Sequence, residues 1–299
     1  MRRLVVTADD FGAAREVNDA VEAAHRHGIL SAASLMVSAP AAADAIARAR
    51  RMPSLRVGLH VVLTQGRPLL PAAEVSELVD SNGLFRSNLT VLGIAIACSR
   101  RARGQLAAEI TAQFTAFHDS GLTLDHCNAH QHFHLHPLIG ELLAAIGRRF
   151  GVRAVRVPLE PAAVLRRVEP RTALATGVLT APFARALRRR LRRSGLVTAD
   201  WLFGLHWSGQ MTRSRLLGLI RNLPPGLSEI YLHPATGSFP GAASGYQYAG
   251  ELEALLDPEV AAACRTSGLR LGGFSDFVEA ASASGAQLAS QGNAAARGV

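Results

Sequence analysis

Lysine is absent from the 299-residue chain, so all 32 of its basic side chains are arginines. Aromatic residues make up only 5% of the sequence, and the core must therefore consist mainly of Ala, Val, Leu and Ile. Charged residues are also few, at 18% against 48% hydrophobic residues, which argues against an intrinsically disordered chain. A chain of this length buries a sizeable core and fits one large α/β domain.

Cysteines and long apolar runs are scarce as well. The three cysteines, Cys98, Cys127 and Cys264, are widely spaced and odd in number, which argues against a disulfide framework and favours reduced thiols. The longest uncharged apolar run, Leu89–Cys98, falls short of the roughly 20 residues that cross a bilayer. Acidic residues follow the first apolar stretch too early for a signal peptide, so we expect a cytoplasmic protein.

The formal net charge is +9, but the lack of lysine beside abundant alanine, glycine and arginine indicates a compositional bias. We therefore attach meaning only to a local cluster of six arginines within Arg185–Arg193. This cluster fits either a solvated helix face or a surface that contacts anionic lipid. Nucleic acid is not expected as a partner, because no recognition motif or stacking aromatic accompanies the arginines.

Short β-branched runs alternate with Ala-rich amphipathic stretches along the chain. Strands are predicted at residues 3–8, 33–38, 56–63, 123–130, 153–158, 200–207, 229–234 and 269–274, and helices at 15–27, 41–51, 104–120 and 137–150. Repeated β-then-α units predict a parallel sheet, and about eight of them predict an irregular (β/α) barrel. We expect one such α/β domain over residues 1–280, with a lid or insertion near 68–103 and a flexible tail at 281–299.

Candidate chemical groups fall in or at the ends of the predicted strands. Asp9 and Asp10 end the first strand, His60 lies in the third, His130 ends the fourth and His233 ends the seventh. The C-terminal strand ends of a barrel form one face, so these residues can converge there. Each alone also fits a structural role, as a helix cap for the acidic pair or as a buried core residue for a lone histidine.

Histidines are concentrated in one short segment. Five of the eleven in the chain lie between residues 126 and 136: His126, His130, His132, His134 and His136. An extended backbone would place His130, His132 and His134 on one face, and neutral imidazole is a common ligand of divalent metal ions. Not all of them can bind one ion, so the others would orient the ligands or line the substrate pocket. The alternative is a surface tract with incidental histidines.

Two histidines and one carboxylate on a single face form a catalytic metal site with open positions for water and substrate. One member of the adjacent acidic pair can bind the ion while the other stays free as a base. Amide cleavage needs such a base and also an acid for the departing nitrogen, and Asp9 and His233 fit these two roles. The set of groups therefore favours a metal-dependent hydrolase.

Four motifs, in this order, resemble the YdjC-like carbohydrate deacetylase family: TADDFG at 7–12, VGLH at 57–60, HQHFH at 130–134 and YLHPATG at 231–237. The resemblance extends from the N-terminus to about residue 280 and implies an irregular (β/α) barrel. It also implies that Asp10, His60 and His130 bind one divalent ion. Asp9 would then be the general base, and His233 would be the general acid.

Residues 32–50 and 124–137 resemble the branch of this family that is associated with hopanoid biosynthesis. That branch implies removal of the acetyl group from an N-acetylglucosaminyl hopanoid, with a chito-oligosaccharide as the alternative substrate. A hopanoid tail would bring the enzyme to the inner membrane surface as a peripheral protein. Family members often carry Asp two residues before the first His of HxHxH, whereas this chain has Asn128. Together with His132 and His134, Asn128 is a candidate to support the ligands or the substrate.

The predicted ligand set suits Zn²⁺, and Mg²⁺, Mn²⁺ and Co²⁺ stay open. One rival hypothesis is another metal-dependent amidohydrolase, although such enzymes usually carry HxH at the end of their first strand. The other is a metal- or lipid-binding protein without turnover, which would not need Asp9 or His233. The sequence carries no signal for an oligomeric state.

Overall fold

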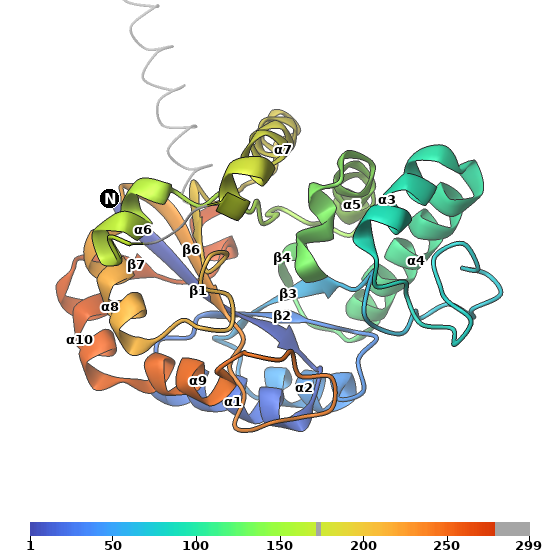
Figure 1. Ribbon diagram of the computed structural model, residues 1–299. Coiled ribbons are helices and arrows are strands. Elements are labelled where there is room, and N and C mark those ends of the chain that lie inside the picture. Colours follow the sequence, from blue (N-terminus) through green and yellow to red (C-terminus); the bar gives the residue numbers. More distant parts are fainter. Residues whose placement is uncertain (172–174, 279–299) are drawn as a thin grey trace, which may run out of the picture.

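The strands of the protein lie in a single parallel sheet that curls into part of a barrel. The computed structural model describes residues 1–171 and 175–278. The strands of this part are β1 (Arg2–Phe11), β2 (Ala32–Leu35), β3 (Arg56–Val61), β4 (Leu124–Ala129), β5 (Trp201–Phe203), β6 (Gly226–Leu232) and β7 (Leu269–Leu271). They are ordered β4-β3-β2-β1-β6-β5, and β7 also pairs with β1. Helices surround the sheet, so the fold is the deformed (β/α) barrel predicted from the alternation of strand and helix patterns (Figure 1).

The helices follow the amphipathic stretches of the sequence. They are α1 (Arg15–His27), α2 (Ala42–Arg50), α3 (Leu89–Cys98), α4 (Arg100–Asp119), α5 (Pro137–Arg149), α6 (Ala162–Val168), α7 (Ala175–Arg193), α8 (Arg213–Asn222), α9 (Tyr248–Leu256) and α10 (Pro258–Thr266), with one 3₁₀ helix, η1 (His130–Leu135). The four predicted helices are confirmed as α1, α2, α4 and α5. The start of α4 lies four residues before the prediction, because the Ser99 hydroxyl accepts a hydrogen bond from the Ala102 N–H and caps the helix there.

Strand β1 lies in the middle of the sheet and is paired along both edges. One edge pairs with β6 over Arg2–Ala8, and the other is shared by β7 over Arg2–Leu4 and by β2 over Thr7–Phe11. Its apolar residues are fully buried, as expected for a strand that is covered on both faces. The register with β2 shifts between Ala8 and Phe11, so the two acidic residues of this strand lie in an irregularity.

Residues 153–158 were predicted as a strand, and this prediction is wrong. The segment forms only isolated parallel bridges, from Val155 to Cys127 and from Ala154 to Val197. Its backbone bonds alternate between these two neighbours, so no ladder of consecutive pairs develops on either side. The fifth strand is shorter than predicted as well, because β5 ends at Phe203, just before Gly204 takes a positive φ of 119°.

The chain between β3 and α4 contains α3 and an antiparallel bridge between Val79 and Phe85. This region covers the lid or insertion expected near 68–103, and a lid function for it remains a proposal. The tail expected at 281–299 lies outside the described residues. No helix among those described combines the length and the apolar character needed to cross a bilayer.

Candidate metal centre and cleft

A cleft of about 810 Å³ lies at the C-terminal ends of the central strands. Asp9, Asp10, His60 and His130 line its polar part. The lining also includes apolar and aromatic side chains, among them Met36, Leu84, Phe85, Phe239, Tyr246 and Tyr248. This volume is typical of a pocket for a small-molecule substrate.

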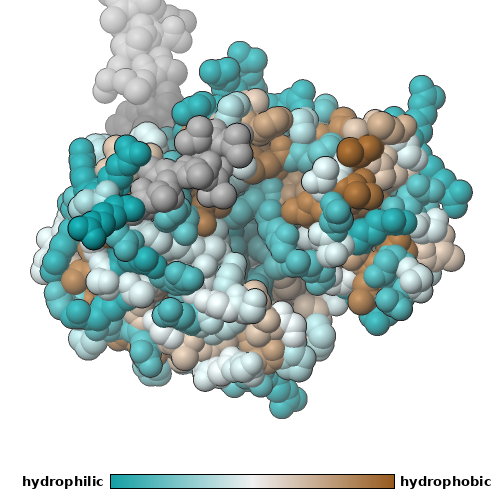
Figure 2. All heavy atoms as spheres, viewed as in Figure 1, coloured by the Kyte–Doolittle hydropathy of each residue, from teal (hydrophilic) through white to brown (hydrophobic). Residues whose placement is uncertain are grey.

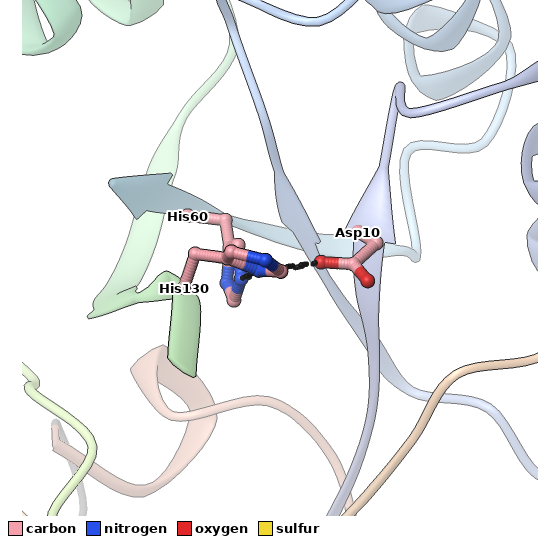
Figure 3. A group of neighbouring side chains, drawn as sticks. All are labelled: Asp10, His60 and His130. Carbon is pink, nitrogen blue, oxygen red and sulfur yellow. Dashed lines mark hydrogen bonds and ion pairs between the residues drawn. The ribbon is translucent and has the colours of Figure 1, made fainter. Parts of the chain in front are cut away.

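Three of the predicted site residues bring one ligand atom each to the same point (Figure 3). Asp10 Oδ1 lies 3.4 Å from His60 Nε2 and 3.2 Å from His130 Nδ1, and the two nitrogens are 3.3 Å apart. A cation bonded to each atom at about 2.0–2.1 Å with tetrahedral angles would set them about 3.3 Å apart. The arrangement of the side chains therefore fits a single divalent ion.

The charge state of this group also suits a cation. Within the described part of the chain, Asp10 Oδ1 is buried and has no hydrogen-bond partner. Burial alone would raise the pKa of Asp10, but the neighbouring His130 and His60 hold it well below its ordinary value. The result is a buried, ionised carboxylate oxygen beside two imidazole nitrogens, which is the donor set expected of a metal site.

The backbone around the cleft is unusual. Four residues other than glycine have a positive φ in the described chain, namely Asp10, Gln65, Gln131 and His132, and all four line this cleft. Such conformations disfavour ordinary side chains and concentrate at functional sites. At Asp10 the left-handed backbone lies within the irregularity of β1.

The histidine-rich segment is not extended, which corrects the expectation that His130, His132 and His134 share one face. Residues His130–Leu135 form the 3₁₀ helix η1, and φ near +52° at Gln131 and His132 turns the chain directly after His130. As a result, His130 alone of these three faces the candidate metal position. His132 Nε2 lies 3.1 Å from the Tyr231 hydroxyl, and His134 Nε2 donates to the Arg156 carbonyl.

Both of these other histidines have neutral rings, with His134 fully buried and His132 partly buried in the lining of the cleft. Burial, assisted by the nearby Arg156 guanidinium, lowers the pKa of His132 well below its ordinary value. Burial also lowers the pKa of His134 to about 4. The two rings therefore support the walls of the cleft and the backbone of Arg156, and they are not ligands in this arrangement.

Asp9 lies beside the metal group and belongs to a different cluster. Its carboxylate accepts hydrogen bonds from both terminal nitrogens of Arg156, with Nη2 at 2.9 Å from Oδ1. The same guanidinium donates to Glu229 Oε1 from Nε at 3.0 Å and from Nη2 at 2.7 Å, and the Tyr231 ring packs on it at 4.7 Å. Burial would raise the pKa of Asp9, but Arg156 outweighs it and holds this pKa well below its ordinary value.

Asn128 lies behind His60 and does not line the cleft. Its side-chain amide is 2.7 Å from His60 Nδ1, on the side of the ring away from the metal position. Each of the two orientations of the amide satisfies different neighbours, and only the second also satisfies Arg156. In one the amide oxygen faces His60, and in the other the amide nitrogen does so while the oxygen accepts from Arg156.

His233 also lines the cleft and follows directly after the end of β6. Its ring packs between Tyr231 and Tyr246, with centroids 5.5 and 5.2 Å away. The Glu251 carboxylate accepts a hydrogen bond from the His233 backbone N–H and so holds this loop in place. Burial raises the pKa of Glu251.

Arg156, Glu229 and Tyr231 were not identified from the sequence. A usable signal existed, because Arg156 lies inside the predicted apolar strand 153–158 and Glu229 opens the predicted strand 229–234. Charged residues inside apolar strands are rarely buried without a partner, so each of these two residues predicts a buried neighbour of opposite charge. Sequence alone did not indicate that they were partners of each other and of Asp9.

A family pattern and two known proteins that share one description match this chain. The pattern of the family described as YdjC-like protein matches residues 3–266. A carbohydrate deacetylase of Geobacillus stearothermophilus is 32% identical over 281 residues, which cover 92% of this chain and 98% of that protein. A carbohydrate deacetylase of Mus musculus is 30% identical over 295 residues, covering 92% of this chain and 94% of the relative.

A solved structure is similar over nearly the same length. A putative cellobiose-phosphate cleavage protein of Enterococcus faecalis superposes with a TM-score of 0.73 at 23% identity, covering 92% of this chain and 98% of the other. At this identity the likeness supports the fold alone. The match of the family pattern over most of the chain, together with two relatives of at least 30% identity over 94% or more of their length, shows that this chain belongs to the YdjC-like protein family.

Proposed function

We propose that this protein is a metal-dependent hydrolase that removes the acetyl group from an N-acetylated sugar. The observation that carries the proposal is the convergence of Asp10, His60 and His130 in the cleft, with ligand atoms 3.2–3.4 Å apart and a second carboxylate, Asp9, beside them. The relatives described as carbohydrate deacetylases support this choice among hydrolases.

We assign the metal ligands to Asp10, His60 and His130. A divalent cation held there would polarise the acetyl carbonyl and make a water molecule more acidic. One carboxylate and two imidazoles at tetrahedral spacing suit Zn²⁺ best, ahead of Mg²⁺, which prefers oxygen ligands in octahedral geometry.

Asp9 is the general base in this proposal. Its carboxylate is ionised and held in a fixed orientation by Arg156, and it lines the cleft next to the ligand group. A carboxylate with so low a pKa is a weak base on its own, so proton removal depends on water that is already acidified. His233, which also lines the cleft, is the proposed donor of a proton to the departing nitrogen.

These roles can be separated by substitution. Replacing Asp9 with Asn should abolish acetate release while the metal content stays that of the wild type. Loss of the metal in the same variant would refute the base assignment. A His233→Ala variant that keeps full activity would exclude His233 as the acid.

For the substrate we propose a glycolipid, N-acetylglucosaminyl hopanoid, with a chito-oligosaccharide as the second candidate. The apolar and aromatic side chains in the lining of the cleft suit a sugar that carries a hydrocarbon group. Acetate release from N-acetylglucosaminyl hopanoid and from N,N′-diacetylchitobiose, measured side by side, decides between them. A clear preference for chitobiose would overturn the glycolipid assignment.

We further propose that the enzyme reaches this substrate at an anionic lipid surface through α3. This helix is apolar on all sides, yet it lies on the surface with Val91 49% and Ile94 59% exposed (Figure 2). Residues 81–108 contain four arginines and no acidic residue, which complements an anionic membrane at about 1 kcal/mol per arginine near the surface. Leu84 and Phe85, just before α3, line the cleft.

The arginine cluster Arg185–Arg193 contributes less to this surface than the sequence indicates. Arg190 pairs with Glu141 at 3.1 Å, and Arg192 pairs with Asp200 at 2.8 Å. These guanidinium groups already have partners within the molecule. The surface proposal therefore depends mainly on α3.

Co-sedimentation with vesicles tests the surface directly. The wild type should bind vesicles of phosphatidylcholine with phosphatidylglycerol more tightly than phosphatidylcholine alone, and Ile94→Glu should weaken this binding. Leu271→Glu is the matched control, because Leu271 is 40% exposed on β7 and not on α3. Equal binding of the wild type to both kinds of vesicle, or an equal loss in both variants, would exclude α3 as the docking surface.

A further inference from the structure

A chain of buried polar side chains runs from His60 into the core, away from the cleft. Asn128 contacts His60 Nδ1 at 2.7 Å, and the Ser34 hydroxyl lies 2.9 Å from the Asn128 amide nitrogen. His126 Nε2 is 3.1 Å from Ser34 Oγ, and His126 Nδ1 is 2.9 Å from Asp125 Oδ2. All five residues are at most 3% exposed, so each of these contacts is made without competition from water.

Asp125, at the far end of this series of side chains, determines the direction of the hydrogen bonds within it. Asp125 is held at the C-terminal segment by the backbone N–H groups of Phe274 and Ser275. Burial would raise the pKa of Asp125, but its hydrogen bond with His126 and its bonds with Ser275 keep the pKa below the ordinary value. An ionised carboxylate only accepts hydrogen bonds, so His126 donates to it from Nδ1, and a neutral His126 ring then offers Nε2 as an acceptor.

The remaining directions follow from this one. Because His126 Nε2 accepts, the Ser34 hydroxyl donates to it and is itself left to accept from the Asn128 amide N–H. This turns the Asn128 oxygen toward His60, whose Nδ1 must then carry a proton. The lone pair of His60 is thereby left on Nε2, the nitrogen that faces Asp10 and His130.

Arg156 acts on the same amide in the opposite sense, because the amide nitrogen that donates to Ser34 lies 2.9 and 3.1 Å from the two terminal nitrogens of Arg156, which are donors themselves. With the Asn128 amide turned around, its oxygen would accept from Arg156 Nη1 at 2.9 Å and Nη2 at 3.1 Å, and its nitrogen would donate to His60 Nδ1. The proton of a neutral His60 would then lie on Nε2, and this nitrogen could not bind a cation. Asn128 therefore has two alternative orientations, of which only one is compatible with a metal.

We propose that Asp125, His126 and Ser34 form a buried relay that holds Asn128 in the orientation required for metal binding, so that they are positioning residues for the ligand His60. The inference rests on the proposed metal site. Imidazole ligands of metals are commonly oriented through their second nitrogen, and loss of such a partner reduces metal affinity. Here the orienting contact continues over three further side chains into the core.

The packing around His126 fits this role. A methyl group at Gly58 would lie 2.5 Å from the His126 ring, so the ring occupies the space that any other residue at position 58 would fill. The Phe274 ring packs on His126 with centroids 5.1 Å apart. The imidazole is thus fixed between strand β3 and the segment after β7, with its two nitrogens aimed at Ser34 and Asp125.

Zn²⁺ titration of the metal-free full-length chain by calorimetry tests the relay. Ser34→Ala and His126→Leu should each weaken Zn²⁺ binding by about 10–100-fold, as for other residues that orient metal ligands. His126→Gln keeps an acceptor for the Ser34 hydroxyl and should retain affinity within a few-fold. Ser31→Ala is the matched control, because within residues 1–171 and 175–278 this buried hydroxyl bonds only to the backbone of Val6, and its loss should leave Zn²⁺ affinity unchanged.

A second readout separates orientation from general loosening of the fold. Nitrogen-15 shifts of the His60 ring in the metal-free chain should show the proton mainly on Nδ1 in the wild type and mainly on Nε2 in Ser34→Ala. Wild-type Zn²⁺ affinity in both Ser34→Ala and His126→Leu would overturn the relay, and so would an equal loss in Ser31→Ala. A wild-type chain that binds no divalent ion overturns the proposed metal site as well, which distinguishes the two failures.

Discussion

Replacing Arg156 with methionine removes the cation from a cluster in which two carboxylates are buried with it. Arg156, Asp9 and Glu229 are at most 2% exposed, and the guanidinium bonds to both acids at 2.7–3.0 Å in addition to its contact with Asp9 Oδ2. Removing one partner of a buried ion pair typically destabilises a protein by about 3–5 kcal/mol. This is a large share of the roughly 5–15 kcal/mol that stabilises a typical domain.

The pH dependence of this loss has a defined sign. In the wild type the pKa of Asp9 is depressed, so its contribution to stability is present above its unfolded pKa and is lost as the pH falls. Without Arg156, burial raises the pKa of Asp9 above the unfolded value of about 3.9, so stability is lost as the pH rises. The deficit of Arg156→Met relative to the wild type should therefore grow from about pH 4 to pH 7.

Urea unfolding followed by circular dichroism at several pH values measures this difference. Arg101→Met is the control, because the Arg101 side chain is 69% exposed with a single 4.0 Å ion pair and should change stability by less than about 0.5 kcal/mol. A loss below about 1 kcal/mol at pH 7 in Arg156→Met, or a loss independent of pH, would refute the reasoning.

Three other predictions concern the neighbourhood of the site. The pKa of His134 is about 4 in the folded chain, so the unfolding free energy should fall by about 3 kcal/mol through this residue between pH 6.5 and 4, and urea unfolding of His134→Gln should show a flatter pH profile there. His130→Ala should lose bound Zn²⁺ in elemental analysis of the purified protein, whereas His132→Ala should keep it; equal retention in both would contradict the ligand assignment. Gly58→Ala should displace the His126 ring, with a loss of about 1–3 kcal/mol in thermal or urea unfolding and weaker Zn²⁺ binding. Unchanged stability and affinity in that variant would show that the ring is not confined.

The sequence identifies the parts of the site that lie on regular elements. Asp10 and His60 could be placed at one face because strand ends of a parallel barrel converge, and this rule needs only the order of strands and helices. Helix α1 was predicted with its observed bounds, since its apolar residues recur with helical spacing. Such a pattern depends only on residues that are close in the sequence, so it can be recognised without the structure.

Contacts between distant residues could not be read in the same way. Arg156 is 147 residues from Asp9, and nothing local indicates that these two charges share one buried cluster. The 3₁₀ helix η1 was missed because the left-handed backbone at Gln131 and His132 is imposed by the surrounding fold and not by residue types that favour it. The relay from His60 to Asp125 was hidden for both reasons, since it depends on tertiary contacts and on the direction of each hydrogen bond.

The charged cluster around Arg156 also limits how this protein can change. Barrel interiors are usually filled by layers of apolar side chains, which tolerate exchange as long as total volume is kept. Here the Arg156 guanidinium bonds to carboxylates on the neighbouring strands β1 and β6, so loss of Arg156 alone would leave two buried carboxylates without their cation. In a library of random variants, neutral drift should therefore accumulate between the helices and the sheet, while Arg156 should be lost only together with its two acidic partners.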